Sequence, residues 1–354
     1  MNIKIIGCGL IGTSIALRLK EKKHEIWLED SNSSNLHLAK DLVGISGEVP
    51  NNIDLIIIAT PLKAIIPILR DLNSIKCSAI VIEVGGIKSK VTSEVEALTD
   101  ISENFVSAHP MAGREMTGPE SARADLFEGR AWILTSSEKT NPKALEVAKK
   151  IGDELGSTTY YLDSKAHDET ITAVSHLPQL LSSLLGNLIS NDDEITLSFA
   201  GQGLRDISRL ADSDSKLWSE LFSENASNLL LKVDEILETV GEFKNALKER
   251  DEKRIENFLV QGKIGRSKIP GKHGAKARNY AHLPIVIGDK PGELARIFDE
   301  CAACNVNVED LSIEHSPNQE TGLVTLSLQP KDAITLREHM INNGWLAQAI
   351  RINS

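Results

Sequence analysis

The sequence contains no long hydrophobic run, few cysteines and fewer positive than negative charges. No stretch reaches the roughly 18 apolar residues that a membrane-spanning helix requires, so we expect no transmembrane segment. Residues 2–6 already have the pattern of a core strand, which argues against a signal peptide. The 4 cysteines are compatible with a reducing compartment. Together these features predict a cytoplasmic protein.

The shortage of positive charge disfavours nucleic-acid binding, and the arrangement of the cysteines disfavours a metal site. Lys and Arg number 39 against 50 Asp and Glu, and the resulting net charge of −11 disfavours a general nucleic-acid binder. Cys301 and Cys304 form a single CxxC inside a helical pattern, with no second pair. We therefore interpret them as core-facing residues and predict no metal site. At 354 residues, the chain should divide into two or three domains.

A glycine-rich turn near the start of the chain has the pattern of a dinucleotide-binding loop. An apolar strand at residues 3–6 precedes it, and a helical pattern follows it. In this fingerprint the first glycine allows a tight turn, the second lets the backbone approach a pyrophosphate, and the third allows close helix packing. The pyrophosphate would lie at the positive end of the helix. The loop residues that we expect to bind the cofactor are Gly7, Gly9, Leu10, Ile11 and Gly12.

An acidic residue at the end of the second predicted strand favours NAD over NADP. Asp30 follows Gly12 by 18 residues, close to the spacing of about 20 at which such a carboxylate accepts the ribose hydroxyls. Its charge would repel a 2′-phosphate, and no arginine follows it closely.

Further strands continue the α/β alternation of a doubly wound, Rossmann-like sheet. Apolar runs predict strands at residues 54–59, 79–84, 104–108, 131–135 and 158–162, with a helix at 142–155. We assign residues 1–163 to this dinucleotide-binding domain. The loops after two of the strands add Thr60, Pro61, Gly85 and Gly86 to the expected cofactor site.

A histidine follows the strand that ends near Ala108. His109 opens a loop that runs to Glu115, at the sheet edge where open α/β sheets bind ligands. A histidine there can exchange a proton near neutral pH, although a lone one can equally cap the strand end through backbone hydrogen bonds. Its place beside a dinucleotide loop favours the role of a base.

Residues 164–262 predict an all-α domain for substrate binding and dimerisation. His176 interrupts an apolar helical stripe, where it is either a buried core histidine or part of the site. Asp206 and Arg209 would share one helix face, as an ion pair or as an arginine held ready for a carboxylate. Trp218 follows, before long leucine-rich helices that we expect to form a subunit interface.

The chain ends in a basic linker and a small α+β domain. Hydrophobic periodicity disappears over residues 263–279, which are rich in Gly, Lys and Arg. Residues 280–354 then predict the order βαββαβ of a ferredoxin-like unit.

These motifs together resemble those of prephenate/arogenate dehydrogenases with a C-terminal ACT domain, and the resemblance covers nearly the whole chain. The stretches that carry it are residues 7–12, 109–115, 175–178 and 204–211, Trp218 and residues 289–294. It implies an NAD-dependent oxidative decarboxylation of prephenate to 4-hydroxyphenylpyruvate in tyrosine biosynthesis, by a homodimer.

The resemblance also implies roles for individual residues. His109 matches the catalytic histidine, and Arg209 matches the arginine that binds the ring carboxylate and that Asp206 would orient. His176, Glu115 and Trp218 match residues on the substrate side. The ACT domain implies tyrosine or phenylalanine as an effector. Its candidate binding residues are Asp289, Pro291, Gly292, Glu293 and Leu294.

One departure from the family pattern concerns how the histidine is held. The family usually has an aspartate at position 83 and a serine at position 86, where this chain has Glu83 and Gly86. No hydroxyl is therefore present at position 86 to orient His109.

Other functions are compatible with parts of this pattern. Arogenate differs from prephenate only in the side-chain amino group, so arogenate dehydrogenase is the alternative activity. A dehydrogenase of another hydroxyacid or an imine is a further one. A noncatalytic regulator that senses NAD and amino acids would keep the glycines and Asp30. It would have no need of His109, His176 and Arg209 together.

Overall fold

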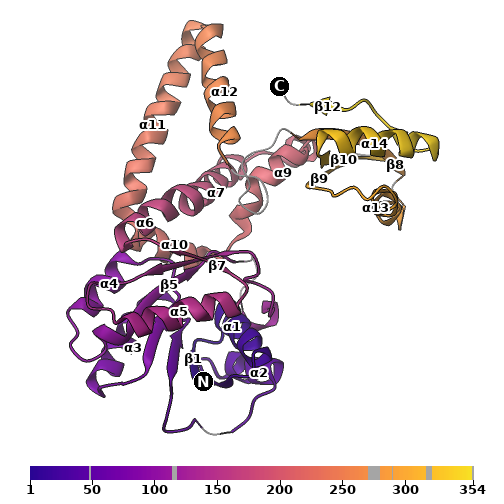
Figure 1. The fold of residues 1–354 in the computed structure, drawn as a ribbon. Helices are drawn as coiled ribbons and strands as arrows, with labels where there is room; N and C mark the ends of the chain where they lie inside the picture. Colours follow the sequence, from indigo (N-terminus) through magenta and orange to yellow (C-terminus); the bar gives the residue numbers. More distant parts are fainter. Residues whose placement is uncertain (48, 114–117, 270–279, 289, 316–320, 353–354) are drawn as a thin grey trace. The chain divides into compact units, whose positions relative to one another are not determined.

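The structure is a computed structural model that describes residues 1–354 except 48, 114–117, 270–279, 289, 316–320 and 353–354 (Figure 1). The chain forms two compact units. One comprises Met1–Ile195 with Ile207–Val240, and the other comprises Thr196–Asp206 with Gly241–Ser354. None of the helices in the described residues combines the length and the apolar character that crossing a membrane requires.

A seven-stranded sheet in the order β2-β1-β3-β4-β5-β6-β7 forms the centre of the first unit. Neighbouring strands are parallel, except that β6 runs antiparallel to β5. Because β1 lies between β2 and β3, the strand order reverses there, and dinucleotides bind at such a switch point. The strands are β1 (Asn2–Ile6), β2 (Glu25–Glu29), β3 (Leu55–Ile58), β4 (Ile80–Glu83), β5 (Phe105–Pro110), β6 (Ala131–Thr135) and β7 (Thr158–Tyr161).

Helices cover both faces of this sheet, as its apolar strands predict. Every side chain of β3 is buried. Because successive side chains of a strand point to opposite faces, Leu55 and Ile57 belong to one core cluster, and Ile56 and Ile58 belong to the other. One cluster contains side chains of α1 (Leu10–Glu21), α2 (Ser33–Val43) and α5 (Pro142–Glu154). The other contains side chains of α3 (Leu62–Ser74) and α4 (Ser89–Glu96).

Helices α6 (Ser164–Ile171) and α7 (Leu177–Ile189) follow the sheet and are joined by a π-helical turn, Thr172–His176. The interruption that the sequence predicts around His176 is thus a local widening of the helix. Pro178 follows this turn directly, and its missing N–H leaves one hydrogen bond of the continuing helix unmade, at the place where the helix widens.

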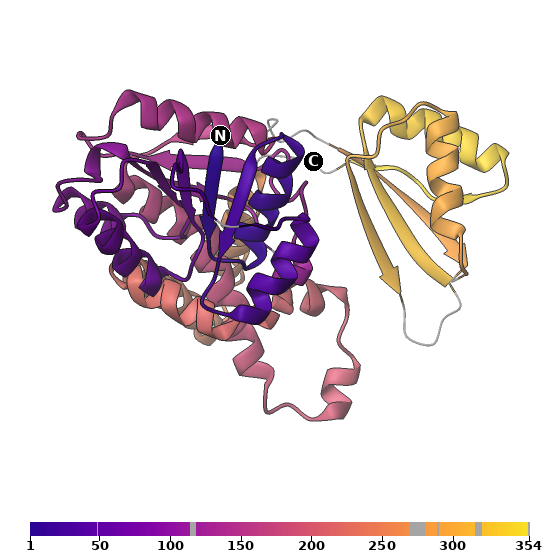
Figure 2. The ribbon, with the colours of Figure 1, turned by 90° about the horizontal axis from the view of Figure 1, so that it is seen from below.

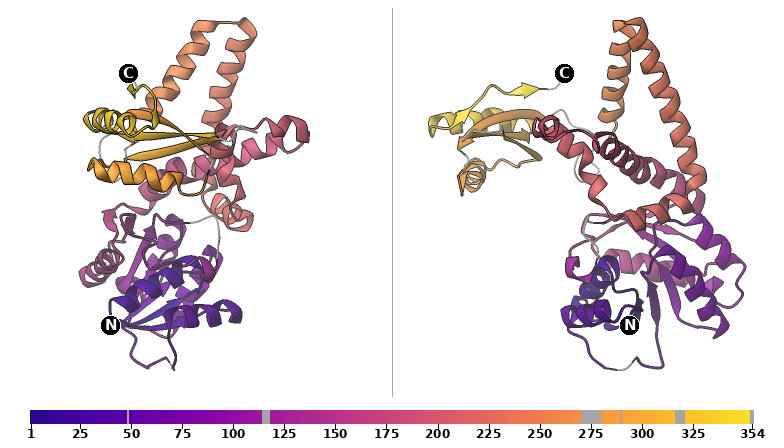
Figure 3. Two further views of the ribbon diagram at one scale, coloured as in Figure 1. Left: turned by 90° about the vertical axis from the view of Figure 1, so that its right-hand side faces the viewer. Right: turned by 180° about the vertical axis from the view of Figure 1, so that it is seen from behind.

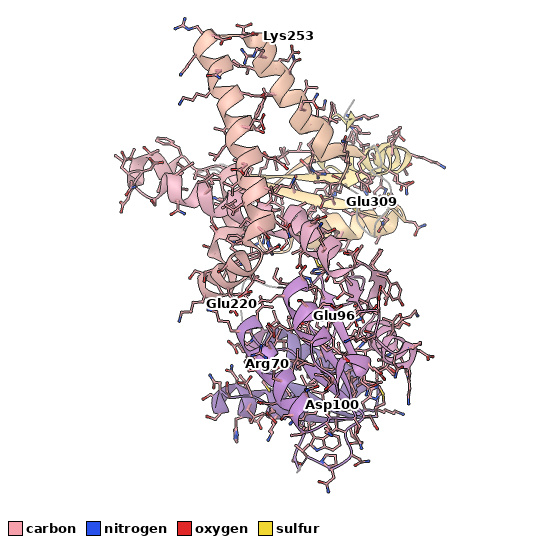
Figure 4. All side chains as sticks on the ribbon, turned by 90° about the vertical axis from the view of Figure 1, so that its left-hand side faces the viewer. Arg70, Glu96, Asp100, Glu220, Lys253 and Glu309 are labelled. Carbon is pink, nitrogen blue, oxygen red and sulfur yellow. The ribbon has the colours of Figure 1, made fainter. Side chains whose placement is uncertain are left out.

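Helix α10 (Ser215–Glu224) packs against two helices of the sheet region. Glu220, labelled in Figure 4, accepts a hydrogen bond from the backbone N–H of Lys63 at 2.7 Å, in the first turn of α3. The ammonium of Lys90 on α4 lies 2.7 Å from the carboxylate of Glu224. These two contacts bring α10 to the loops that follow β3 and β4.

The second unit begins with helical segments. Phe243, near the end of α11 (Ala226–Glu249), packs on Phe258 of α12 (Glu252–Ser267) with ring centroids 4.5 Å apart, and the two helices run antiparallel (Figure 3). Asp251 caps the N-terminus of α12 through the N–H of Arg254. The short helices α8 (Glu194–Ser198) and α9 (Gln202–Ser208) lie earlier in the chain.

Helix α12 continues to Ser267, five residues into the range expected to be a linker. Gly262 and Gly265 lie at exposed helical positions, where glycine costs only about 1 kcal/mol and does not end a helix. Residues 270–279 of that linker lie outside the described residues.

A small antiparallel sheet with the order β11-β8-β10-β9 forms the rest of the second unit, and β12 also pairs with β8. Helices α13 (Glu293–Ala303) and α14 (Pro330–Asn342) share one core cluster with it and lie on the same side of it (Figure 2). This is the βαββαβ order that the sequence predicts. The strands are β8 (Ala281–Gly288), β9 (Asp310–His315), β10 (Thr321–Leu328), β11 (Leu346–Ala347) and β12 (Arg351–Ile352).

Two details of this domain differ from what its apolar runs predict, which is a strand at residues 306–308 and one unbroken final strand at residues 347–352. Residues 306–308 are not a strand, because the N–H of Val306 is used to close the end of α13 by donating to the carbonyl of Cys301 at 2.9 Å. The final strand is split into β11 and β12. The N–H of Gln348 donates to the carbonyl of Pro284 on β8, but a proline has no N–H to return, so the ladder is interrupted there.

Candidate active site

The glycine loop after β1 has the geometry that the fingerprint predicts. Gly7 has a φ of +103°, and a Cβ there would lie 2.5 Å from the carbonyl oxygen of Ala59. A Cβ on Gly12 would lie 1.9 Å from the carbonyl oxygen of Gly7, so neither position accepts a side chain. At Gly9, by contrast, a Cβ would meet nothing within 4 Å. Open space therefore lies beside the N-terminus of α1, where a phosphate can approach the backbone.

The carboxylate of Asp30 lies beside this loop. Its Oδ2 accepts the backbone N–H of Cys8 at 2.6 Å, and its Oδ1 accepts the N–H of Asn32 at 2.7 Å. Both oxygens keep a lone pair for a further donor, such as a ribose hydroxyl. At the end of β3, the Oγ1 of Thr60 is buried and has no hydrogen-bond partner among the described residues. An unpaired buried hydroxyl is uncommon, and a bound ligand would satisfy it.

His109 lies within β5 rather than in the loop after it. The expected strand ends at Ala108, but β5 continues to Pro110 because the antiparallel strand β6 pairs with it, Ile133 opposite His109. The pairing with β6 therefore holds the backbone of this histidine on one side, whereas the pairing of β5 with β4 ends at Ser107. Glu115, at the far end of the expected loop, lies outside the described residues.

The imidazole of His109 begins a chain of two hydrogen bonds. Its Nδ1 lies 2.9 Å from Nε2 of His167, and Nδ1 of His167 lies 2.8 Å from Oδ1 of Asp168. The carboxylate of Asp168 is held by the backbone N–H groups of Lys88 and Ser89, each at 2.9 Å. Burial alone would raise the pKa of Asp168, but the hydrogen bonds from His167 and Ser89 lower it, so the group is ionised.

The ionised carboxylate assigns the tautomers of both histidines. Asp168 can only accept, so Nδ1 of His167 carries the proton and its Nε2 accepts from Nδ1 of His109. The Nε2 atom of His109 is then unprotonated, and no described residue hydrogen-bonds to it. Burial lowers the pKa of His109 well below 6.5, and the nearby ammonium of Lys88 adds to this shift. The ring is therefore neutral at pH 7 and ready to accept a proton.

Gly86 lies next to this bare nitrogen. A Cβ at position 86 would lie 3.9 Å from Nε2 of His109 and 2.9 Å from Cδ2 of Leu221 on α10. Position 86, where the family usually has a serine, is therefore close to Nε2 of His109. A methyl group of Leu221 lies next to this position. The hydrogen bond between His109 and His167 is made at the other ring nitrogen, Nδ1.

A buried ion pair lies beneath the histidine. The ammonium of Lys88 lies 2.6 Å from Oε1 of Glu83 and 2.6 Å from the carbonyl oxygen of Ala108, and both charged side chains are fully buried. Ser107 donates its hydroxyl to the same oxygen of Glu83. Burial lowers the pKa of Lys88, and the charge of Glu83 opposes that shift. The pair ties the ends of β4 and β5 together immediately before His109.

His176 and Trp218 come together as expected. Their ring centroids lie 5.9 Å apart, and Phe222 lies 5.7 Å from the same histidine. The amide of Asn225 donates to Nδ1 of His176 at 3.3 Å and to Oγ1 of Thr172 at 2.8 Å. Burial lowers the pKa of His176 to about 4, so this histidine is also neutral at pH 7.

Asp206 and Arg209 do not share a helix. Helix α9 ends at Ser208, and the 3₁₀ turn Arg209–Asp212 follows it directly. The carboxylate of Asp206 accepts a hydrogen bond from the amide of Gln202 at 2.7 Å. The turn that carries Arg209 is held by Gln179 of α7, whose amide donates to the carbonyl of Leu210 at 2.8 Å.

The turn before α13 is only partly described. Asp289 lies outside the described residues, whereas Pro291, Gly292 and Leu294 are exposed. Gly292 has a φ of +91°, in the left-handed region, and caps the helix. Glu293 pairs with Arg296 at 2.8 Å.

Three residues of the site were not predicted as such: His167, Asp168 and Lys88. His167 lies four positions before Ile171, on the buried face of α6, and this spacing was the one signal for its burial. The contacts of Asp168 and Lys88 join segments about 80 positions apart, which no local pattern can reveal.

Comparison with known proteins supports one family along most of the chain. The family described as "Prephenate dehydrogenase, nucleotide-binding domain" matches residues 14–161, and "Prephenate dehydrogenase, dimerization domain" matches residues 163–261. "Probable prephenate dehydrogenase NovF" of Streptomyces niveus is 30% identical over 98% of this chain and 99% of its own length. "Prephenate dehydrogenase" of Bacillus subtilis (strain 168) is 25% identical over 94% of this chain and 93% of its own.

Solved structures agree with these sequence relatives. The prephenate dehydrogenase of A. aeolicus, in complex with hydroxyphenyl propionate and NAD⁺, is 28% identical with a TM-score of 0.68. The similarity covers 75% of this chain and 97% of that one. With its glycine loop, its neutral histidine at the sheet edge and these relatives, the chain belongs to the prephenate dehydrogenase family of NAD-dependent oxidoreductases.

Proposed function

We propose that the chain oxidises prephenate with NAD and releases 4-hydroxyphenylpyruvate and CO₂. The observation that carries this proposal is the unprotonated Nε2 of His109, at the carboxyl edge of a sheet whose first loop is a dinucleotide fingerprint. Family membership supplies the reaction type. The residues of the site supply the base.

The residues around the glycine loop fit a dinucleotide. The open space at Gly9 and the N-terminus of α1 suit a pyrophosphate, the free lone pairs of Asp30 suit ribose hydroxyls, and the unpaired Thr60 hydroxyl suits a further polar contact. Leu10, Ile11 and Gly12 belong to the first turn of that helix, while Pro61, Gly85 and Gly86 follow the strand ends. When bound there, NAD supplies the acceptor for the hydride that leaves the hydroxyl-bearing ring carbon.

The side chains of this protein then have separate tasks. His109 takes the hydroxyl proton at Nε2 as the carbonyl forms, and loss of the ring carboxylate as CO₂ completes an aromatic ring. Arg209 binds the ring carboxylate, which a planar guanidinium matches with two parallel hydrogen bonds. His176 and Trp218 line the substrate side. The sequence resemblance assigns Glu115 and Asp206 to substrate binding as well.

Activity assays test this proposal. NADH formation should require prephenate, should be faster with NAD than with NADP, and should fall about 10²-fold or more in His109→Asn, the range expected for losing a general base. Full activity in His109→Asn would remove His109 from the mechanism. Turnover of arogenate but not prephenate would assign the alternative substrate. Absence of turnover with both, despite NAD binding, would support a noncatalytic sensor.

We also propose that the βαββαβ domain is an ACT-like domain that binds tyrosine or phenylalanine. The support is its strand order, together with the exposed Pro291, Gly292 and Leu294 and the neighbouring Glu293 at the start of α13. The sequence resemblance assigns Asp289 to the same binding site. Titration calorimetry on the full chain should show heat with one of these amino acids, and Gly292→Val should abolish it. No heat with either amino acid would make the domain an assembly module.

Finally, we propose that the protein is a cytoplasmic homodimer. The family model of residues 163–261 is described as a dimerization domain, and α7 and α11 expose large apolar side chains there. Sedimentation velocity should give a dimer at micromolar concentration, and aspartate substitutions on these helices should give monomers. The exposed side chains are Leu181, Leu184, Leu188, Leu230, Leu231 and Leu237.

A further inference from the structure

The base at the active site is a pair of histidines joined to a carboxylate. The line His109–His167–Asp168 has hydrogen-bond distances of 2.9 and 2.8 Å. His167 and Asp168 are 0% and 2% exposed, so water does not compete for these bonds. A single base needs no such extension. The sheet already holds the backbone of His109, and one acceptor would suffice to orient its ring.

The charges around the pair are not balanced when both rings are neutral. Two buried carboxylates, Glu83 and Asp168, face one buried ammonium, Lys88. Among the described residues, His176 of the π turn is the remaining titratable group beside His109, and it is neutral at pH 7. Leu221 of α10 brings a methyl group next to Gly86. The cluster therefore carries one negative charge before the reaction and becomes neutral when the histidine pair gains one proton.

We propose that His167 shares the proton that His109 accepts, so that the positive charge comes to rest beside Asp168. As Nε2 of His109 bonds the substrate hydroxyl proton, the N–H bond at its Nδ1 breaks. That proton moves 2.9 Å along the hydrogen bond to Nε2 of His167. His167 becomes an imidazolium whose Nδ1–H remains hydrogen-bonded to the Asp168 carboxylate, and His109 ends the step neutral. The two histidines together gain one proton, and the positive charge is on His167, next to the carboxylate of Asp168.

This arrangement addresses a difficulty of a buried base. Burial lowers the pKa of both His109 and His167, which keeps them neutral but weakens them as bases. The hydrogen bond that His167 donates to Asp168 raises the pKa of His167 and partly opposes that effect. Moving the charge from His109 to His167 places it against this carboxylate. The inference rests on the proposed function, since it takes His109 as the acceptor of the substrate proton.

The variant His167→Gln separates proton sharing from simple orientation. The amide oxygen of glutamine can accept the Nδ1–H of His109 at the place of the imidazole Nε2, but an amide cannot take up a proton near neutral pH. If His167 shares the proton, His167→Gln should lower kcat about 10-fold or more and move the acid limb of kcat/KM to lower pH. The Kd for NAD should stay within a factor of about two. Wild-type kcat with an unchanged pH profile would overturn the proposal.

Two further measurements keep the outcome independent of folding and of the proposed function. In the wild-type enzyme, a proton inventory in mixtures of H₂O and D₂O should require two protons in motion for kcat, and a one-proton fit would overturn the proposal. The exposed His37→Gln is the matched control and should leave every parameter unchanged. If His109→Asn were fully active, His109 would not be the base on which this inference rests. If the wild-type enzyme did not turn over prephenate, the proposed function itself would fail. A normal His167→Gln beside an inactive His109→Asn would reject proton sharing alone.

Discussion

The ammonium of Lys88 lies 2.6 Å from the carboxylate of Glu83, and neither side chain is exposed to solvent. A buried pair of this kind adds little net stability, but removing one partner leaves an uncompensated charge inside the protein. Single substitutions in this ion pair, or in the hydrogen-bonded His109, His167 and Asp168 next to it, should therefore disturb the ends of β4 and β5.

Lys88→Met should therefore destabilise the protein by about 3–5 kcal/mol, because Glu83 loses its partner without regaining water. Urea unfolding at pH 7 measures this change. The double variant Glu83→Leu with Lys88→Met should recover much of the loss, since neither charge then remains. As a control, Lys90→Met removes an ion pair whose lysine is about half exposed, and it should cost no more than about 1 kcal/mol. Equal losses in both lysine variants would contradict the role of burial.

Catalysis should persist at pH values where an ordinary histidine is protonated. The pKa of His109 lies well below 6.5 because of burial, so the accepting form is already complete at neutral pH. We expect kcat/KM to stay level from pH 8 to 6.5 and to fall only at lower pH. A profile that is half-maximal at pH 6.5 or above would show that the ring is not desolvated in the working enzyme.

The stability of the protein should fall as the pH drops from 6.5 toward 4. The pKa of His176 is lowered by burial to about 4, whereas in the unfolded chain it is about 6.5. Between these values the unfolded state binds a proton that the folded state does not, so acid favours unfolding. His176 alone should contribute a loss of about 2 kcal/mol between pH 7 and pH 5. Urea titrations of His176→Gln should show a shallower pH dependence, and an unchanged slope would contradict this pKa.

Gly12→Ala should impair both folding and NAD binding. The added methyl group would lie 1.9 Å from a backbone carbonyl, which cannot move aside as a flexible side chain can. We expect at least a 10-fold higher Kd for NAD, measured by fluorescence titration. The control is Gly241→Ala in α11, where a Cβ would meet nothing within 4 Å. The higher helix propensity of alanine should raise the free energy of unfolding by up to about 1 kcal/mol there.

Arg209→Ala should raise the KM for prephenate and leave the KM for NAD unchanged, if the guanidinium binds the substrate carboxylate. Gln179→Leu should act in the same direction but less strongly, because Gln179 holds the turn of Arg209 through the carbonyl of Leu210. Steady-state kinetics with each substrate varied in turn measures both effects. An unchanged KM for prephenate in Arg209→Ala would remove Arg209 from the carboxylate site.

Local patterns predicted much of this structure. The glycines of the first loop, the acid after β2 and the apolar runs of the sheet act over a few residues, so spacing and composition reveal them. The βαββαβ order of residues 281–352 was predictable for the same reason. By contrast, the extension of β5 through His109 depends on an antiparallel partner more than 20 positions away, and its bounds were missed. The change from an α-helix to a 3₁₀ turn between Ser208 and Arg209 was not predicted either.

By itself, the sequence determined that the chain has a dinucleotide fold with a histidine at its binding edge, because hydrophobic period and glycine spacing are properties of short segments. It also showed that no hydroxyl is present at position 86. Only the tertiary structure decided what holds that histidine instead. His167 and Asp168 reach it from a helix about 60 positions further along the chain, and Lys88 and Glu83 meet beneath it. The pairing of buried polar groups depends on how distant segments pack, and packing is a property of the folded chain as a whole.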